Sequence, residues 1–252
     1  MIKKLSLLLL LCVTLVSPVV GQDADPAVDP AAAPPKIWTG DFGAGLSLTS
    51  GNSETTNFNA SFNLLRDPKT KNLMKFTGLY LRGSESDEKT VDRLRLGFRD
   101  EYTLSDRAFV YGDLGYLRDP FKEINYLVNP NGGIGYRLYD TDRMSLQVDG
   151  GAGAVWENNL DQDTRSSGSL NLGQNLDFAF SDSARLTQNF AALWKMDDFE
   201  DALYHFAIGV AASVTKQTEL KVELIDDFKN KPPSADTKKN DVAFVASFLF
   251  KF

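Results

Sequence analysis

The stretch from Asp241 to Phe252 constrains the fold of this chain more than any other. Its apolar side chains fall on every second position, as Val242, Phe244, Ala246, Phe248, Phe250 and Phe252. Alternation with a period of two predicts a β-strand. At about 3.3 Å per residue, this strand is long enough to cross a bilayer at a tilt. A soluble edge strand this apolar would aggregate. We therefore predict that it is paired on both edges and faces lipid on one side, in a closed transmembrane barrel.

The same stretch carries an expectation about assembly. A terminal aromatic residue preceded by apolar residues at alternate positions is typical of chains that the bacterial outer-membrane assembly machinery inserts. We therefore expect an assembly signal formed by Phe244, Phe248, Phe250 and Phe252. The expected partners are the barrel assembly machinery of a Gram-negative cell, outer-membrane lipid and lipopolysaccharide, and the expected oligomeric state is a monomer.

The alternation extends from Trp38 onward, through about twelve segments of roughly 10–13 residues. In one of them Phe58, Ala60 and Phe62 oppose Asn57 and Asn59. No segment holds a convincing helical period, so we predict an all-β chain. The predicted fold is a closed antiparallel transmembrane barrel of about 12 strands, an up-and-down meander over residues 38–252. Two glutamines on the predicted lipid face, Gln174 and Gln188, depart from the pattern without an explanation in the sequence.

The connections between segments are of two kinds. Short links rich in turn-forming residues are Arg66–Lys71, Thr103–Arg107, Asp140–Arg143, Ser181–Ser183 and Thr215–Thr218. They alternate with mostly longer polar links, Ser84–Thr90, Asp119–Ile124, Glu157–Ser166, Met196–Asp201 and Lys229–Asn240. Outer-membrane barrels have short periplasmic turns and longer extracellular loops. We therefore place both ends of the barrel domain in the periplasm, and expect aromatic girdles near both sets of connections.

The N-terminal part of the chain reads as export sequence. Lys3 and Lys4, an apolar run from Leu5 to Val16 and small residues up to Gly21 predict a signal peptide over residues 1–21. The alternative is an uncleaved helical anchor, but the run is short for a span. Residues 22–37 are rich in Pro and Ala and predict a disordered or extended periplasmic linker. A role of this linker in binding peptidoglycan or a partner is the alternative.

Composition excludes several classes of function. Lys and Arg number 27 against 34 Asp and Glu, so nothing electrostatic supports nucleic-acid binding. The one Cys rules out an internal disulfide, and the one His makes a protein-bound metal centre poorly supported. A soluble barrel or sandwich is the alternative fold, because alternation alone does not say which face points inward. Segment length, segment number and the export signal favour the membrane barrel.

The inward face is where a function would lie, and it carries charges of both signs. The candidate lumen-lining residues are Arg93, Arg95, Arg99, Asp113, Arg137, Asp149, Asp177, His205, Lys221 and Glu223. Charged rings in a wet pore set selectivity, so the three arginines of one segment predict an anion-attracting stripe. The other interpretation is that pairs across strands neutralise a crowded interior. We favour partly paired charges.

An enzyme is the least supported hypothesis. Twelve-stranded outer-membrane phospholipases use a Ser–His pair that faces lipid, whereas His205 falls on the inward positions. Nothing around Ser169, Ser213 or Ser247 resembles a nucleophile motif. The glycine clusters lack the strand–loop–helix setting of a phosphate site, and the acidic loops have no Ca²⁺-loop spacing. We therefore predict no catalytic residue, no cofactor site and no metal site.

Several motifs resemble a known family. Trp38 with the following glycines, Ser50–Thr55, Gly132–Leu138, Gly150–Gly153 and the run Asp226-Asp227, Pro232-Pro233, Lys239–Asp241 are similar, in this order, to the family of salt-induced outer-membrane proteins, a domain of unknown function. The resemblance covers roughly residues 38–252. It implies an outer-membrane barrel and a link to salt or osmotic response, and it brings no catalytic residues. Ser234-Ala235 stands where the resemblance leads us to expect a glycine.

We therefore hypothesise an outer-membrane barrel that forms a narrow channel for small solutes or ions. The alternative is a non-conducting structural or adhesive barrel that acts through its extracellular loops. Dense paired charges and bulky lumen residues would favour the alternative, and a continuous water path would favour the channel.

Overall fold

The computed structural model describes residues 36–50, 55–85 and 88–252. The chain divides into two units, residues 1–34 and 35–252, and the second contains the barrel. The predicted signal peptide, nearly all of the predicted linker and part of the first expected loop lie outside the described residues.

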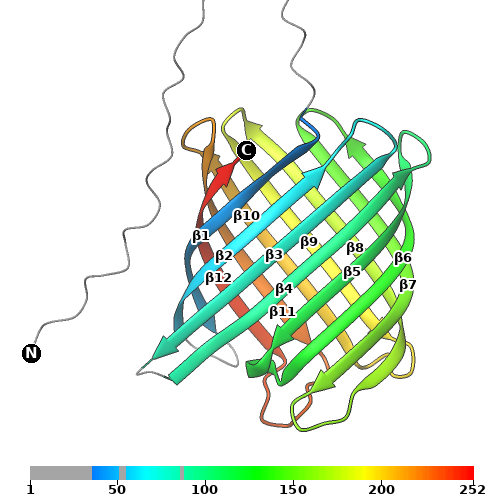
Figure 1. Ribbon diagram of the computed structural model, residues 1–252, viewed down its shortest axis with the longest axis vertical. Coiled ribbons are helices and arrows are strands. Elements are labelled where there is room, and N and C mark those ends of the chain that lie inside the picture. Colours follow the sequence, from blue (N-terminus) through cyan, green and yellow to red (C-terminus); the bar gives the residue numbers. More distant parts are fainter. Residues whose placement is uncertain (1–35, 51–54, 86–87) are drawn as a thin grey trace, which may run out of the picture. The chain divides into compact units, whose positions relative to one another are not determined.

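The described part of the chain forms one closed antiparallel barrel (Figure 1). Its strands are β1 (Trp38–Ser50), β2 (Thr55–Arg66), β3 (Asn72–Glu85), β4 (Glu88–Thr103), β5 (Ala108–Asp119), β6 (Ile124–Asp140), β7 (Met144–Asn159), β8 (Arg165–Ser181), β9 (Ala184–Lys195), β10 (Ala202–Ser213), β11 (Thr218–Lys229) and β12 (Asn240–Lys251). Each strand pairs with the next, and β1 pairs with β12. The predicted all-β meander of about twelve strands is confirmed.

The closing strand is paired on both edges, as predicted. Phe250, Phe248 and Phe244 of β12 stand opposite Phe42, Ala44 and Leu48 of β1. The backbone N–H of Phe252 donates to the carbonyl oxygen of Gly40 at 3.1 Å. The aromatic alternation that marks this strand in the sequence therefore lies on one face of the seam, with both strand edges paired.

The two faces of the barrel are inverted relative to a soluble protein. Phe42, Leu46 and Phe58 point outward and remain more than half exposed, whereas the inward Asn57 and Asn59 are buried. Apolar side chains cover the outside because this surface contacts the hydrocarbon chains of the lipid. This arrangement excludes the soluble barrel, in which the apolar face would be the core.

The two ends of the barrel differ in their connections (Figure 1). At the turn end the links are residues 67–71, 104–107, 141–143, 182–183 and 214–217, and β1 starts and β12 ends there. At the loop end are residues 120–123, 160–164, 196–201 and 230–239. The first of these contains η1 (Pro120–Lys122), the one helical element among the described residues. None of the described helices is long and apolar enough to span a membrane.

One predicted connection is wrong. The stretch Ser84–Thr90 is mostly strand, because β3 and β4 continue to pair through Ser84 with Lys89 and Glu85 with Glu88, after a register shift at Gly83. Backbone pairing depends on main-chain hydrogen bonds and does not require the apolar alternation that ends earlier. The polar residues of this stretch therefore marked the end of the apolar alternation, and β3 and β4 continue beyond that point.

Candidate functional site

The lumen of the barrel encloses a cavity of about 770 Å³. Its wall is built mainly from odd-numbered positions of the strands, since inward and outward side chains alternate along each strand. Nine of the ten predicted lumen residues lie on this wall: Arg93, Arg95, Arg99, Asp113, Asp149, Asp177, His205, Lys221 and Glu223. The tenth, Arg137, lies outside the cavity near the turn end, where its guanidinium stacks over the ring of Phe109 at 4.9 Å.

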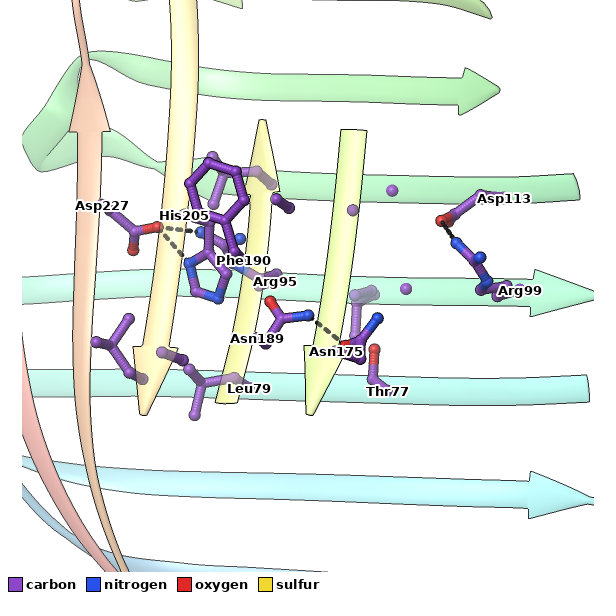
Figure 2. Close-up of a pocket in the computed structure, with 18 of the residues that line it drawn as sticks. Thr77, Leu79, Arg95, Arg99, Asp113, Asn175, Asn189, Phe190, His205 and Asp227 are labelled. Atoms are coloured by element: carbon purple, nitrogen blue, oxygen red, sulfur yellow. Dashed lines mark hydrogen bonds and ion pairs between the residues drawn. The ribbon is translucent and has the colours of Figure 1, made fainter. Parts of the chain in front are cut away.

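Uncharged amides cover part of the wall formed by β6, β8 and β9. Asn189 donates to Asn175 at 2.6 Å, and Asn129 donates to Asn171 at 2.8 Å. Ser169 completes the second group by donating to Asn129 at 3.1 Å. Figure 2 shows Asn175 and Asn189 side by side on neighbouring strands. These pairs leave further amide donors and acceptors for water or a polar solute.

A cluster of charges crosses the lumen near the loop end. We call Arg93, Asp119, Lys122, Asp227 and Asp241 the cross-mouth cluster. Arg93 uses all three of its nitrogens, on Asp119 at 2.6 Å, Asp227 at 3.0 Å and Asp241 at 3.2 Å. Lys122, which enters from η1, donates to the backbone carbonyl of Asp227 at 2.6 Å and lies 3.3 Å from Asp241.

The cross-mouth cluster spans the lumen from one wall of the barrel to the opposite wall. β5, which carries Asp119, and β11, which carries Asp227, are six strands apart in a ring of twelve, so they stand on opposite walls. Each of the five residues is less than a tenth exposed. The cross-mouth cluster, made of buried and mutually paired charges, therefore joins the two sides of the barrel at its loop end.

More side chains fill the same end. The carboxylate of Glu157 pairs with both Lys195 and Lys229, and Asp201 lies 2.5 Å from Lys195. Two apolar clusters pack inside the barrel wall: one contains Leu81, Val91, Ala207, Ile225, Ala243 and Val245, the other Ile124, Leu127 and Val155. The loop end of the lumen is thus packed by paired charges and aliphatic groups, and the cavity lies below them.

Three loops are joined on the outer side of the cross-mouth cluster. Glu123, next to η1, accepts hydrogen bonds from the hydroxyls of Ser234 and Thr237 in the β11–β12 loop, both at 2.6 Å. The hydroxyl of Ser234, followed by that of Thr237, lowers the pKa of the Glu123 carboxyl below its ordinary value, because both hydrogen bonds favour the ionised form. The backbone N–H of Leu160 also donates to the carbonyl of Glu123 at 2.9 Å. The three loops therefore form one connected lid.

The turn end has charge clusters on both sides, the first of them around Arg99. Arg99 bonds Glu101 at 2.8 Å, Asp149 at 3.0 Å and Asp113 at 3.3 Å, and it stacks over the ring of Tyr111 at 3.9 Å. On the other side, Arg185 pairs with Asp177 at 3.2 Å and with Glu219 at 3.0 Å, and Lys251 lies 2.7 Å from Glu219. The side chains of Asp177 and Arg185 remain 46% and 37% exposed. Access to solvent at this end is therefore greatest along β8 and β9.

The structure separates residues that the sequence presented as equivalent. Arg93 and Arg99 are each held by three carboxylates, whereas Arg95 contacts one, Asp227, at 2.7 Å. Lys221 and Glu223 pair with each other at 2.6 Å. The lumen therefore carries mainly paired charges, as the interpretation that we favoured expects, and an open stripe of three cations is not formed.

His205 pairs with a carboxylate, and the three serines weighed as its partners bond other groups. His205 Nδ1 lies 2.7 Å from Asp227 Oδ1. The hydroxyl of Ser169 donates to Asn129, that of Ser213 to Glu219 and that of Ser247 to Asn59. None of these serines bonds His205 in the described part of the chain. Nor do the described residues contain a group of three or more His, Cys, Asp or Glu that is arranged to hold a metal ion.

Sequence reasoning missed several residues of the loop-end packing, above all Asp119, Lys122, Glu157, Lys229 and Asp241. Four of them stand at the ends of strands on inward, odd-numbered positions, so extending the alternation into the predicted loops would have found them. Lys122 belongs to a connection, and its place inside the barrel depends on how η1 folds, so no periodic pattern marks it.

Comparisons with known proteins agree with this architecture. The sequence profile of the family "Protein of unknown function, DUF481" matches residues 42–252. No curated protein sequence matches the chain. The fold is similar to that of the NanC porin, with a TM-score of 0.56, 9% sequence identity and coverage of 84% of this chain and 100% of that one. It is also similar to the COG4313 outer membrane channel from Pseudomonas putida F1, with a TM-score of 0.50, 13% identity and coverage of 90% and 100%.

Proposed function

The chain belongs to the DUF481 family, whose function is unknown, and we propose that its barrel is a narrow outer-membrane channel for small polar solutes. In the arrangement described here the cross-mouth cluster and the lid hold the loop end closed. The observation that carries the proposal is the cavity of about 770 Å³ inside the barrel, which charged, amide and apolar side chains line together. A volume of this order is typical of sites for small molecules.

The composition of the cavity wall supports transport more than packing. A barrel of eight strands fills its interior with side chains, and barrels of sixteen or more strands leave an aqueous channel. This twelve-stranded barrel keeps a space whose wall includes amides and charges beside its apolar side chains, so that water and polar solutes find hydrogen-bond partners there. Two outer-membrane barrels of similar fold carry the words porin and channel in their descriptions.

The orientation in the membrane follows from the connections. We place the loop end outside the cell and the turn end in the periplasm, because outer-membrane barrels have longer extracellular loops and short periplasmic turns. Both ends of the barrel domain then lie in the periplasm, and residues 1–21 act as the signal peptide for export. Under this arrangement the cross-mouth cluster is an extracellular gate, and the cavity opens toward the periplasm along β8 and β9.

A specific observation favours the alternative of a non-conducting barrel. Buried ion pairs and aliphatic clusters fill the loop end, and such packing is what a structural or adhesive barrel would contain. The two functions differ in whether the cross-mouth cluster can open. If the barrel is a channel, breaking the ion pairs of this cluster leaves a folded barrel that conducts ions. If the barrel is structural, the other side chains packed at the loop end still block the current.

Single-channel conductance in a planar bilayer distinguishes the two functions. Arg93→Gln removes the cation that holds Asp119, Asp227 and Asp241 together, so the three carboxylates should repel one another and the mouth should open more often. We expect rare or small conductance steps in the unsubstituted protein and an open probability at least about tenfold higher in the variant. The matched control is Arg82→Gln on the exposed outer face of β3, which should leave conductance unchanged.

Folding of both variants is checked by circular dichroism and by migration on gels before and after heating. If the folded Arg93→Gln barrel stays as silent as the unsubstituted protein, the channel function is wrong. The salt response that the family resemblance implies belongs to the same experiment. Conductance that rises with ionic strength faster than the conductivity of the solution would support it, because salt weakens ion pairs that water reaches.

A further inference from the structure

The arginines on β4 differ in how many of their hydrogen-bond donors the protein uses. All three nitrogens of Arg93 and of Arg99 contact carboxylates, and their side chains are 9% and 15% exposed. Arg95 lies between them on the same face, and one nitrogen, Nη2, contacts Asp227. Its side chain is 33% exposed and lines the cavity. Nε and Nη1 of Arg95 have no partner among the described residues, so they remain donors for something in the lumen.

His205 stands beside Arg95 and shares its anchor. Nδ1 of His205 and Nη2 of Arg95 both lie 2.7 Å from the same oxygen of Asp227. Figure 2 shows the two side chains converging on this carboxylate from different strands. Asp227 is in turn held by Arg93 at 3.0 Å. The carboxylate therefore fixes the direction of both side chains, and Nε2 of His205, on the far side of the ring, is left for the cavity.

The neighbouring wall supplies space and neutral polar groups. Ala191, opposite His205 on β9, is small and exposed to the cavity. Asn189, two positions along the same strand, pairs with Asn175 through one donor and one acceptor. Each amide has further hydrogen-bonding capacity. A guanidinium edge, an imidazole nitrogen and two amides thus surround one part of the cavity.

This set of groups has a definite chemical preference. A guanidinium with two free N–H groups matches an oxyanion such as a carboxylate. When Nδ1 of His205 donates to Asp227, the neutral ring presents Nε2 as an acceptor, which pairs with a hydroxyl. We propose that Arg95 and His205, oriented by Asp227, form a lumen site for small organic anions that also carry hydroxyl groups. The site deepens the proposed channel function by naming its solute class, and binding within it does not require an open mouth.

The test is equilibrium binding to the full chain folded in detergent, followed by NMR of the Arg95 Nε and His205 ring signals. Three probes separate the two parts of the chemistry: gluconate has both a carboxylate and hydroxyls, sorbitol has the hydroxyls alone, and acetate has the carboxylate alone. We expect gluconate to bind at least about tenfold more tightly than either of the others, since it makes both kinds of hydrogen bond. Equal affinity for gluconate and acetate would overturn the assignment of His205 and the amides.

Matched variants locate the site. Arg95→Gln should weaken gluconate binding about tenfold or more. Lys75→Gln removes one positive charge from the same lumen, from a side chain that is 32% exposed, and should change binding less than about twofold. His205→Phe should lower the affinity for gluconate and leave that for acetate unchanged.

If Arg95→Gln and Lys75→Gln weaken binding equally, the effect is the general charge of the lumen and the site is wrong. Absence of gluconate binding to the folded protein also overturns it. Because these measurements need no current, a barrel that binds gluconate and stays silent in the bilayer would refute the channel and keep the site. A barrel that conducts ions without binding gluconate would refute the site and support the channel.

Discussion

At the scale of single residues, the number of partners decides what a charged side chain in this lumen does. Arg93, Arg95 and Arg99 occupy three of the four inward positions from 93 to 99 on one strand, and their local sequence does not distinguish them. Arg93 and Arg99 meet three carboxylates each; all of them except Glu101 come from other strands, and so the two arginines act as cross-links. Arg95 meets one and keeps donors toward the cavity. Chain neighbours did not reveal this difference, because five of the six carboxylates come from other strands.

A prediction at this scale contrasts a buried ion pair with an exposed one. Glu157→Gln removes the carboxylate that bonds both Lys195 and Lys229, and leaves Asp201, 2.5 Å from Lys195 and 4.0 Å from Lys229, as the remaining carboxylate. Removing one partner of a buried pair is costly, and we expect a loss of about 3–5 kcal/mol in the free energy of unfolding. Urea unfolding of the barrel in lipid vesicles, followed by tryptophan fluorescence, measures it.

The matched control is Asp177→Asn, which breaks the half-exposed pair with Arg185 in the same lumen. Water screens this pair, so the change should stay within about 1 kcal/mol. Similar losses in the two variants would show that burial at the loop end does not set the strength of these pairs.

At the scale of elements, each strand has to satisfy a lipid face and a lumen face at once. The two glutamines that broke the outward pattern illustrate how. Gln188 on β9 donates to Gln174 on β8 at 2.8 Å, so each amide provides the other with a hydrogen bond on the lipid face. Period-two reasoning identified both departures correctly. It could not pair them, because the register between β8 and β9 brings Gln188 one row away from Gln174, opposite Leu176.

This arrangement predicts non-additive effects of substitution. Gln174→Leu or Gln188→Leu alone leaves an unpaired amide facing lipid and should destabilise the barrel by about 1–3 kcal/mol. Replacing both by Leu removes the polar pair altogether and should be neutral or stabilising. A double-mutant cycle of urea unfolding in vesicles measures the coupling energy. Losses that simply add in the double variant would mean that the hydrogen bond contributes nothing.

At the scale of the whole barrel, closure and the lid make contacts between parts of the chain that are distant in sequence. Glu123 reaches Ser234 and Thr237 across the mouth, and Arg93 reaches Asp227 and Asp241. These contacts join β4 and the β5–β6 connection to the last two strands. The loop end is therefore tied as one unit, and any opening must break polar contacts between opposite walls.

The lid should depend on pH with a definite sign. The pKa of Glu123 is lowered by the hydroxyls of Ser234 and Thr237, so its contribution is present in full at neutral pH and is lost as the pH falls below about 4. We expect residues 230–239 to exchange their amide hydrogens faster at low pH, after correction for the intrinsic exchange rate. In Glu123→Gln this dependence should disappear. An equally strong dependence in the variant would assign it to other groups.

The amino-acid sequence by itself determined the fold class, the number of strands and the face of each strand. The reason is physical: a strand in a bilayer must alternate apolar and polar side chains, and this alternation can be recognised within a single segment of about ten residues. The sequence also indicated His205 as an inward residue and Gln174 and Gln188 as outward ones, because parity along a strand is a local property.

The tertiary structure alone decided which lumen charges neutralise one another, how the loop end is packed and which donors remain free. Each of these depends on register and closure, which set side by side residues such as Arg93 and Asp241, 148 positions apart. The entry of Lys122 into the lumen depends further on a short 3₁₀ turn in a connection. Contacts of this kind are properties of the closed barrel, and no single strand contains them.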